Sequence, residues 1–479
     1  MSKIVVLGAG VCGLAAGVLL SRDGHEVTVL ERDPEPPPDS PVDAWERWSR
    51  DGVSQFRLAH YLTPRGRIVL EEALPDVLAG LEAAGGVAFD PLPLMPPPIT
   101  DRAPRDGDGR FRTVTARRPV FEQVLARVAD SEPGLGIRRG VSVAGLVAEA
   151  SNGGGGPPHV SGIHTDAGEQ LEADLIVDAM GRRSQLPRWL ETVGAGPVHE
   201  EAEDSGFIYY GRFFRAGSAG MPDYRAPLLM PIGGFSMLTL PSDNDTWSVT
   251  VYTSAGDRPL KRLRDPAPWT ALVQACPLHA HWLEGEPITD MVAMGGIADR
   301  YRRLVVDGKS VATGVALLGD SSTCTNPSLG RGMTLGLLHA QRLAETVHDH
   351  LDDPDEFAEA WDAVTEAELT PWYRETVAED RARFNEMEAL RHGLVASPEP
   401  GSMPWLQRAL LAAVPRDADA FRAFLANRSC LSLNQEIFDD ANFMERVFEL
   451  AQSAGPPPPL AGPDRDQLLA LLDATPATA

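Results

Sequence analysis

The 479-residue sequence predicts an α/β fold with three parts: a parallel-sheet domain, an antiparallel sheet inserted into it and a helical C-terminal region. Three observations support this prediction. Residues 1–31 read as strand, glycine-rich turn, helix and strand; residues 205–254 contain long strand-like runs; and residues beyond 351 have mainly helical patterns. Strands that alternate with helices favour parallel pairing, whereas strands joined by short turns favour antiparallel pairing.

A Rossmann-like dinucleotide-binding unit is predicted at the N-terminus. An apolar strand at Lys3–Leu7 leads into Gly8, Gly10 and Gly13, and a helix then connects to a second strand at Glu26–Glu31. The first glycine permits a tight turn, the second lets the backbone approach a pyrophosphate, and the third allows close helix packing. The N–H groups of the helix end favour phosphate, and the acid that ends the second strand can bind ribose hydroxyls. From this unit we assign cofactor contacts to Gly8, Gly10, Val11, Cys12, Gly13, Glu31 and Arg32.

The residues between this unit and the antiparallel sheet predict loops, helices and further strands. Prolines make Asp33–Asp39 a surface loop and Pro91–Pro104 an irregular excursion, because proline removes a backbone donor and restricts φ. Apolar spacing predicts helices over Ala59–Ala84 and from Arg117 onward. A flexible loop is expected at Ser151–Pro158. The strands predicted here lie near Val141–Val147, Val160–Thr165 and Leu175–Asp178.

Residues 205–254 predict an antiparallel sheet that forms a wall of a substrate cavity. A short turn joins the last two of its strands, which are Phe207–Phe214, Phe235–Leu240 and Trp247–Thr253. Because side chains alternate between the two faces of a strand, only one face can line a cavity, and one of Tyr209 and Tyr210 must point away from it. An apolar lining suits an aromatic, polycyclic or olefinic substrate. The candidate cavity residues are Phe207, Tyr209, Phe213, Met230, Phe235 and Met237.

The remaining sequence predicts one more strand and then helices. A strand over Ser310–Leu318 leads into a glycine-rich helix start at Gly330–Met333. The tail from Leu351 onward is predicted to be helical, with breaks at Pro398–Pro404 and Gly455–Pro459. We expect this tail to pack over the antiparallel sheet or to close the cavity.

Composition and charge exclude several classes of function. The net charge of −25 argues against non-specific binding to nucleic acid or to an anionic membrane, because both select basic surfaces. The four cysteines are widely separated and show no metal-ligand spacing, so neither a disulfide framework nor a metal site is expected. The chain also shows no signal peptide and no apolar run long enough for a transmembrane helix. A cytoplasmic protein is expected.

Three further segments resemble the flavoprotein monooxygenases built on the para-hydroxybenzoate hydroxylase fold. The first combines Arg50, in Arg-Asp-Gly-Val, with Arg118 at the start of an Arg-x-x-Phe-x-x-x-Leu helix. The resemblance implies that both arginines touch the ribityl and phosphate groups of FAD, and it places Val143 among the FAD contacts. Guanidinium suits this role because it offers a rigid fork of donors and stays charged.

The second segment, Asp174–Ser184, is similar to the middle motif of that family, which lies near FAD and has been linked to pyridine-nucleotide contacts. The usual Asp-Gly pair is here Asp178-Ala179, with Gly181 displaced. This variant looks more like the motif of styrene monooxygenases and flavin-dependent halogenases, whose FAD arrives already reduced. The resemblance therefore leaves two electron routes open: NAD(P)H acting directly, or NAD(P)H acting through a separate flavin reductase.

The third segment, Gly319–Met333, is the most specific. It matches the family pattern of Gly-Asp, a proline seven residues later and Gly-x-Gly at a helix start. The resemblance implies that Asp320 binds ribityl hydroxyls and that the backbone near Gly330, Gly332 and Met333 faces the flavin. Two departures are Thr323, where many members have His, and Thr334, where many have Asn.

The resemblance also implies a division of the chain. The cofactor domain comprises three segments that are separated by substrate-domain segments and followed by the helical tail. We place FAD-binding segments at 1–75, 111–195 and 298–350, substrate-domain segments at 76–110 and 196–297, and the helical region at 351–479.

These features predict an FAD-dependent monooxygenase of secondary metabolism, acting on an apolar aromatic or olefinic small molecule. The resemblance implies that reduced flavin and O2 give a C4a-hydroperoxide, which transfers one oxygen atom by hydroxylation or epoxidation. His60 is the candidate catalytic side chain, while His339 is expected to be structural. The alternatives are a flavin-dependent halogenase, although no Trp-x-Trp-x-Ile-Pro motif occurs, a reductase of the geranylgeranyl-reductase type, and a flavin-bound redox sensor.

Overall fold

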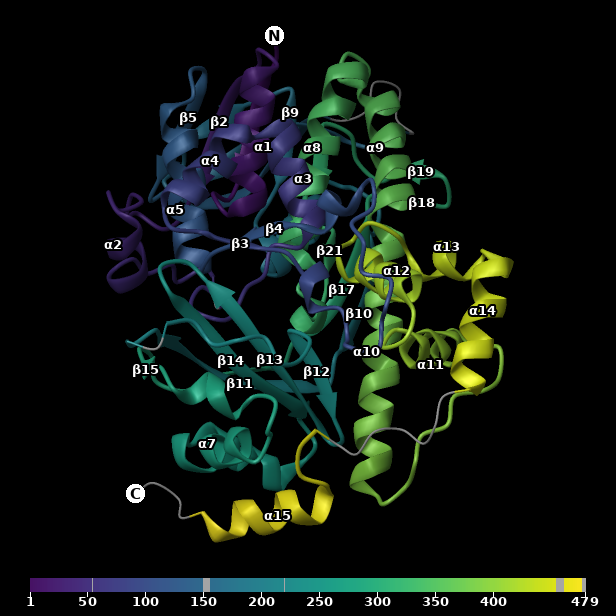
Figure 1. Ribbon diagram of the computed structural model, residues 1–479. Coiled ribbons are helices and arrows are strands. Elements are labelled where there is room, and N and C mark those ends of the chain that lie inside the picture. The colour runs from purple at the N-terminus through teal and green to yellow at the C-terminus, as the bar shows by residue number, and fades with distance from the viewer. Residues whose placement is uncertain (54, 150–155, 219, 454–460, 476–479) are drawn as a thin grey trace.

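The computed structural model describes residues 1–479 except 54, 150–155, 219, 454–460 and 476–479. Figure 1 shows the parallel sheet and its helices in the upper part, the antiparallel sheet below it, and C-terminal helices along one side. The breaks and loops expected at Ser151–Pro158 and Gly455–Pro459 fall largely outside the described residues.

The N-terminal βαβ unit is confirmed and forms the middle of a parallel sheet. Alternating residues of its first strand bury opposite faces: Ile4 and Val6 pack into the helix-covered core, and Val5 and Leu7 into the core on the other face. Helices α1 (Val11–Arg22), α5 (Arg118–Ser131) and α8 (Gly332–His350) cover the first face. The strand order is β20 (Val315–Leu317), β9 (Leu175–Asp178), β1 (Lys3–Leu7), β2 (Glu26–Glu31) and β5 (Leu135–Arg139).

Smaller sheets and helices surround this parallel sheet. On the second face lie β6 (Val143–Glu149), β7 (His159–Thr165) and β8 (Gln170–Glu172), paired antiparallel. Strands β3 (Val87–Phe89) and β4 (Thr113–Thr115) flank the irregular excursion. The helices of this part are α2 (Pro41–Glu46), α3 (Pro64–Ala73), α4 (Pro75–Ala83) and α6 (Leu186–Thr192).

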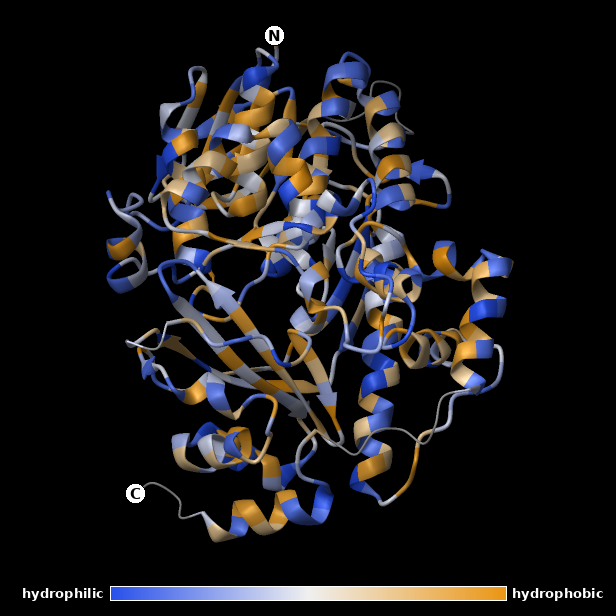
Figure 2. Cartoon of the chain, viewed as in Figure 1, coloured by the Kyte–Doolittle hydropathy of each residue, from blue (hydrophilic) through white to orange (hydrophobic). Residues whose placement is uncertain are grey.

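The inserted antiparallel sheet is confirmed, and its two faces are both covered. Its order is β12 (Leu229–Ile232), β13 (Phe235–Ser242), β14 (Thr246–Ser254), β11 (Phe207–Arg215) and β15 (Glu286–Pro287), and β16 (Val292–Gly295) also pairs with β11. Helices α7 (Pro266–Gln274) and α15 (Arg465–Ala474) cover the face that carries Trp247 and Phe214. Figure 2 shows hydrophobic and hydrophilic residues alternating along α15, as expected for a helix with one buried side.

The helical C-terminal region packs on the other parts, as expected. Helix α10 (Thr370–Arg391) runs along the antiparallel sheet, where Phe384 contacts Phe207 and Arg383 donates to Ser236 Oγ at 3.0 Å. The neighbouring helices are α9 (Pro354–Glu368), α11 (Met403–Ala413), α12 (Ala418–Arg428), α13 (Asn434–Phe438) and α14 (Ala441–Gln452).

The structure corrects some predicted boundaries. The helix expected from Ala59 begins only at Pro64, because proline is favoured at the first helical position and the preceding residues are extended. The strand expected over Ser310–Leu318 is broken by Gly314, whose φ of +69° lies in the left-handed region. The sequence also missed β10 (His199–Asp204), a polar strand that pairs with β17 (Ala298–Arg303), which in turn pairs with β21 (Thr323–Cys324).

Candidate functional site

The glycine turn after β1 leaves one open position beside tightly packed backbone. Gly8 has φ of +106°, and a Cβ there would lie 2.8 Å from the carbonyl oxygen of Ala179. A Cβ on Gly13 would lie 2.0 Å from Gly8 O, so both positions require glycine for packing. A Cβ on Gly10, in contrast, would meet no atom within 4 Å. The open side of Gly10, at the N-terminus of α1, is where a pyrophosphate would fit.

Glu31 and Arg50 meet beside this turn. The Glu31 carboxylate accepts a hydrogen bond from the Ala9 N–H at 3.0 Å and also contacts the Arg50 guanidinium. Arg50 is buried and donates to Ala9 O at 2.8 Å. Arg32, by comparison, is exposed beside Gly52. Glu31 and Arg50 therefore brace the glycine turn, and their contacts with a cofactor stay a prediction.

Glu122 is a site residue that the sequence analysis missed. Its fully buried carboxylate accepts from Arg50 Nη1 at 2.7 Å and from Arg118 Nε at 2.6 Å. Burial by itself raises the pKa of Glu122, but Arg118 and Arg50 lower it below its usual range overall. The single carboxylate of Glu122 therefore holds in place both of the arginines that are predicted to contact the cofactor. The sequence does contain an indication of this role, because Glu122 is an acid four residues after Arg118 on a helix face that is otherwise apolar.

His60 joins this network as a neutral acceptor. Its Nε2 lies 3.2 Å from Arg118 Nη1 and its Nδ1 lies 3.0 Å from Leu58 O. A protonated Nδ1 therefore donates to the carbonyl, and Nε2 accepts from the guanidinium. Burial and the charge of Arg118 lower the pKa of His60 to about 3. The geometry favours a role in orienting Arg118, and the predicted catalytic role of His60 stays a prediction.

The altered middle motif has a structural function in the fold. Asp178 is buried, accepts from the Met180 N–H at 3.0 Å and contacts the Ser184 hydroxyl, so it shapes the turn at Gly181. Burial raises the pKa of Asp178 to about 6. Val143 begins β6 on the second face of the parallel sheet and packs in the core there. The cofactor contacts of Asp178 and Val143 stay predictions.

Asp320 lies where the N-termini of α1 and α8 come together. Cys12 links the two helices: a Cβ on Gly319 or on Gly336 would lie 2.6 or 2.3 Å from its Sγ. The Asp320 carboxyl is half-buried and accepts no hydrogen bond from any residue that the structure describes. Burial raises its pKa, while Arg118 and Arg182 oppose that shift. An unbonded carboxyl beside two helix N-termini fits the ribityl hydroxyls of FAD.

The start of α8 is exposed, and the residue before it is bound to the C-terminal region. Gly330 has φ of +66°, and Met333 is half-buried. Gly332 is exposed, and a Cβ there would meet no atom within 4 Å. The buried Arg331 before it donates to Glu375 Oε1 at 2.9 Å. The space beside Gly332 is therefore open at this helix N-terminus, which fits the predicted FAD contacts.

The two departures from the family pattern have local explanations. The Thr334 hydroxyl accepts from the Thr63 N–H at 3.1 Å and from the Thr63 hydroxyl at 2.9 Å, which joins α8 to the segment before α3. Thr323 pairs with Tyr301 across β21 and β17. Both threonines therefore serve the packing of the chain.

His339 is structural, as expected, and it positions Gly319. Its Nδ1 accepts from the Gly319 N–H at 3.1 Å, its Nε2 lies 3.1 Å from Thr365 Oγ1, and its ring stacks on Trp361. Burial lowers the pKa of His339 to about 3. This histidine therefore stays neutral in the folded protein.

We expect His339 to make stability fall in mild acid. Because its pKa is lower in the folded than in the unfolded chain, stability is complete above pH 6.5 and is lost as the pH falls towards 3. At pH 5 the loss from this residue is about 2 kcal/mol. Urea unfolding at pH 7 and pH 5 checks this: His339→Gln should remove that part of the pH dependence, and exposed His164→Gln should not. An unchanged pH dependence in His339→Gln would contradict the assignment.

The six candidate cavity residues divide between the two faces of the antiparallel sheet. Phe207 and Tyr209 lie on the face that contacts Ala59, Tyr61 and Phe384, and Phe213 contacts Trp45 edge-on at 5.0 Å. The other three belong to the core under α7 and α15, because strand alternation turns them away from Tyr209. The cavity assignment is therefore corrected for Met230, Phe235 and Met237. Tyr210 also lies on that opposite face, as one of the tyrosine pair was expected to do.

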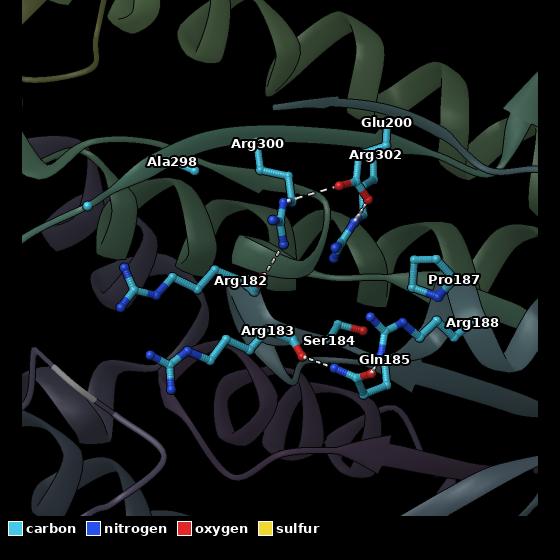
Figure 3. Close-up of a pocket in the computed structure, with 11 residues that line it drawn as sticks. Arg182, Arg183, Ser184, Gln185, Pro187, Arg188, Glu200, Ala298, Arg300 and Arg302 are labelled. Atoms are coloured by element: carbon cyan, nitrogen blue, oxygen red, sulfur yellow. Dashed lines mark hydrogen bonds and ion pairs between the residues drawn. The ribbon is translucent and has the colours of Figure 1, made fainter. Parts of the chain in front are cut away.

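An arginine-rich pocket of about 560 Å³ adjoins the middle motif. Figure 3 shows Arg182 and Arg183 extending in the same direction, while Arg300 lies between Glu200 and the backbone of Arg182. Arg302 donates to the same Glu200 carboxylate at 2.7 Å. The pocket therefore carries a strong positive charge on a chain of net charge −25. Its charged lining residues are Arg182, Arg183, Arg188, Glu200, Arg300 and Arg302.

Cys12, Cys276, Cys324 and Cys430 are free thiols. Among the described residues, no group of three His, Cys, Asp or Glu side chains could hold a metal ion. No helix in the described ranges is long and apolar enough to cross a membrane.

Comparisons with known proteins agree with this geometry. A family model described as FAD binding domain matches residues 1–354. Protein Rv3254 of Mycobacterium tuberculosis is 28% identical over 372 residues, 71% of each chain. The kynurenine 3-monooxygenase of Salinispora arenicola is 23% identical over 385 residues, 73% of each chain. PqsL of Pseudomonas aeruginosa, described as a probable FAD-dependent monooxygenase, has a similar fold: the TM-score is 0.57 at 18% identity, covering 81% of this chain and 99% of PqsL. Another PqsL structure is a complex with 2-aminobenzoylacetate.

Proposed function

The chain belongs to the FAD binding domain family, and on this premise we propose that it inserts one oxygen atom from O2 into an apolar aromatic or olefinic small molecule. The reaction is a hydroxylation or an epoxidation in secondary metabolism. One observation carries the proposal: the apolar sheet face meets the segment that leads into α8, where Tyr209 donates to Asn326 Oδ1 at 2.9 Å. A substrate on this face would therefore lie next to the predicted flavin contacts. The complex of PqsL with 2-aminobenzoylacetate supports a small-molecule substrate.

The residues of the chain would bind the cofactor and exclude water. FAD, when bound, supplies the electron transfer and the reaction with O2. The N-terminus of α1 would hold the pyrophosphate, and Asp320 would accept hydrogen bonds from ribityl hydroxyls. The N–H groups at Gly332 and Met333 would stabilise negative charge on the flavin edge. Phe207 and Phe213 would keep water from the substrate face.

Labelled oxygen tests the function. We expect the purified protein to show a flavin spectrum after addition of FAD and to place 18O from labelled O2 in the product of an accepted aromatic or olefinic compound. Product formation that requires halide would instead support the halogenase alternative, and turnover without oxygen would support a reductase. Protein that acquires no flavin spectrum with FAD would contradict the proposal.

We also propose that NAD(P)H docks directly in the arginine-rich pocket. Arginines bind phosphate through paired, charge-assisted hydrogen bonds, and this pocket begins at the motif that adjoins Asp320. This positive charge favours reduction of the flavin by NAD(P)H bound to this protein over reduction by a separate flavin reductase. Anaerobic mixing of the FAD-loaded protein with NADPH separates the two routes, because rapid bleaching of the flavin requires direct reduction.

The exposed Arg183 offers a specific test of the pocket. Losing one charged phosphate contact costs about 1.5 to 3 kcal/mol, so we expect Arg183→Ala to raise the KM for NADPH at least about tenfold. FAD affinity should not change. Arg408→Ala, at an exposed position on α11, is the matched control. An unchanged KM in Arg183→Ala would contradict the docking of NADPH in this pocket.

A further inference from the structure

A buried hydrogen-bond chain connects the sheet face to the C-terminal region. Tyr209 on β11 donates its hydroxyl to Asn326 Oδ1 at 2.9 Å, and Asn326 Nδ2 donates to Asp380 Oδ2 on α10 at 3.0 Å. The Ser328 hydroxyl donates to the other oxygen, Asp380 Oδ1, at 2.5 Å. All four side chains are at most 5% exposed. Asp380 lies beyond the residues that the family model matches, so this chain of contacts is not part of the family's motifs.

Asp380 determines which groups donate and which accept in this chain of hydrogen bonds. An ionised carboxylate only accepts hydrogen bonds, so the amide nitrogen of Asn326 must face it and the amide oxygen must face Tyr209. The hydroxyl hydrogen of Tyr209 is then committed to Asn326. Towards the sheet face, the phenolic oxygen can offer only a lone pair, and it can only accept a hydrogen bond.

Protonation of Asp380 would reverse the donor and acceptor roles in the hydrogen bonds that Asn326 makes with Asp380 and with Tyr209. A proton taken from solvent onto Oδ2 turns the carboxyl into a donor, which favours the amide oxygen of Asn326 in place of its nitrogen. The amide then rotates by half a turn, and its N–H2 donates to the oxygen of Tyr209. The hydroxyl hydrogen of Tyr209 stays on the oxygen but becomes available to the sheet face. The network gains one proton in all, and no bond to carbon changes.

We propose that Asp380 is a positioning residue that determines, through Asn326, whether Tyr209 accepts or donates a hydrogen bond on the substrate face. With Asp380 ionised, Tyr209 would select a substrate that carries an O–H or N–H donor. With Asp380 protonated, Tyr209 would select an acceptor such as a carbonyl or ether oxygen. The substrate part of this inference rests on the proposed function; the hydrogen-bond reversal does not.

The charges around Asp380 place the reversal near neutral pH. On β17, Asp299 accepts from the Asn326 backbone N–H at 2.6 Å, and neither Asp299 nor Asp380 forms an ion pair with any described residue. On α10 itself, Glu379 is paired with Arg428 at 2.8 Å. Burial raises the pKa of Asp380 to about 7, and the charges of Asp299 and Glu379 contribute to that rise.

The remaining groups that face the network change charge further from pH 7 than Asp380 does, or keep a fixed charge. Burial raises the pKa of Asp299 to about 6, which Arg381 opposes from α10. The Tyr252 ring, on β14, lies 5.0 Å from the Tyr209 ring, and burial raises the pKa of both hydroxyls. Arg383 is bound to Ser236. Asp380 is therefore the group in this network whose charge changes nearest to pH 7.

Ultraviolet resonance Raman spectroscopy of the full chain tests the proposal. The intensity ratio of the tyrosine Fermi doublet is low for a donating hydroxyl and high for an accepting one. The chain has 7 tyrosines, so the Tyr209→Phe spectrum is subtracted to isolate Tyr209. We expect a low ratio above pH 7 that rises as the pH falls, with a midpoint of about 7. Asp380→Asn should lose this transition.

Asp299→Asn is the matched control. It removes a neighbouring negative charge but leaves Asp380 ionisable, so the transition should persist with its midpoint at lower pH. A ratio for Tyr209 that does not change with pH in the wild-type chain would overturn the proposal, whatever the variants do. A transition that persists in Asp380→Asn, or disappears in Asp299→Asn, would also overturn it. The measurement needs neither turnover nor labelled oxygen, so failure of the proposed function leaves it unaffected.

Discussion

Asp320→Ala is expected to lower the affinity for FAD about 10- to 100-fold. Hydrogen bonds to a charged group are worth about 1.5 to 3 kcal/mol, and about 1.4 kcal/mol corresponds to a tenfold change in affinity. The Asp320 carboxyl has no hydrogen-bond partner among the described residues, so its removal takes nothing from the fold. Quenching of flavin fluorescence during titration of the apoprotein measures the change.

Two further variants separate this effect from a general loss of negative charge. Asp349→Ala removes an exposed acid near the end of α8 and should leave FAD affinity unchanged. Asp320→Asn keeps one acceptor oxygen and should have an intermediate affinity. Because burial raises the pKa of Asp320, FAD affinity in the wild type should also fall in mild acid, and Asp320→Asn should not show this fall. Full flavin occupancy in Asp320→Ala would contradict the assignment.

Glu122→Ala is expected to lower the free energy of unfolding by about 3 kcal/mol, the cost of leaving buried charge without its partner. Glu122 is fully buried between Arg50 and Arg118, and removing it leaves Arg118 without an ion pair among the described residues. Urea unfolding measures the change. The FAD affinity should fall as well, because both predicted cofactor arginines lose their common anchor.

The exposed pair of Arg67 and Glu71 provides the matched control. It has the same spacing of four residues on a helix and an N–O distance of 2.8 Å, but the Glu71 side chain is 59% exposed. Glu71→Ala should cost less than about 0.5 kcal/mol. If Glu122→Ala and Glu71→Ala lowered the free energy of unfolding equally, burial of the Glu122 network would contribute nothing to stability.

Local patterns predicted the N-terminal βαβ unit and the start of α8 correctly. The alternation of apolar residues, the glycine turn at Gly8 and the helix start at Gly332 depend on neighbours within a few residues, so they are readable in the sequence. The polar strand β10 was missed because a strand rich in acidic residues has no apolar alternation, and it is stabilised by pairing with β17, about a hundred residues away.

The sequence by itself determined that this chain belongs to the FAD binding domain family, because each cofactor motif is a short segment with its own geometry. Only the tertiary structure decided which sheet residues share a face, so that Tyr209 stays at the candidate site while Phe235 and Met237 leave it. Only the tertiary structure brought Glu122 to the predicted arginines and Asp380 to Asn326. Contacts between residues so far apart in the chain depend on how whole elements pack, and no local pattern records that packing.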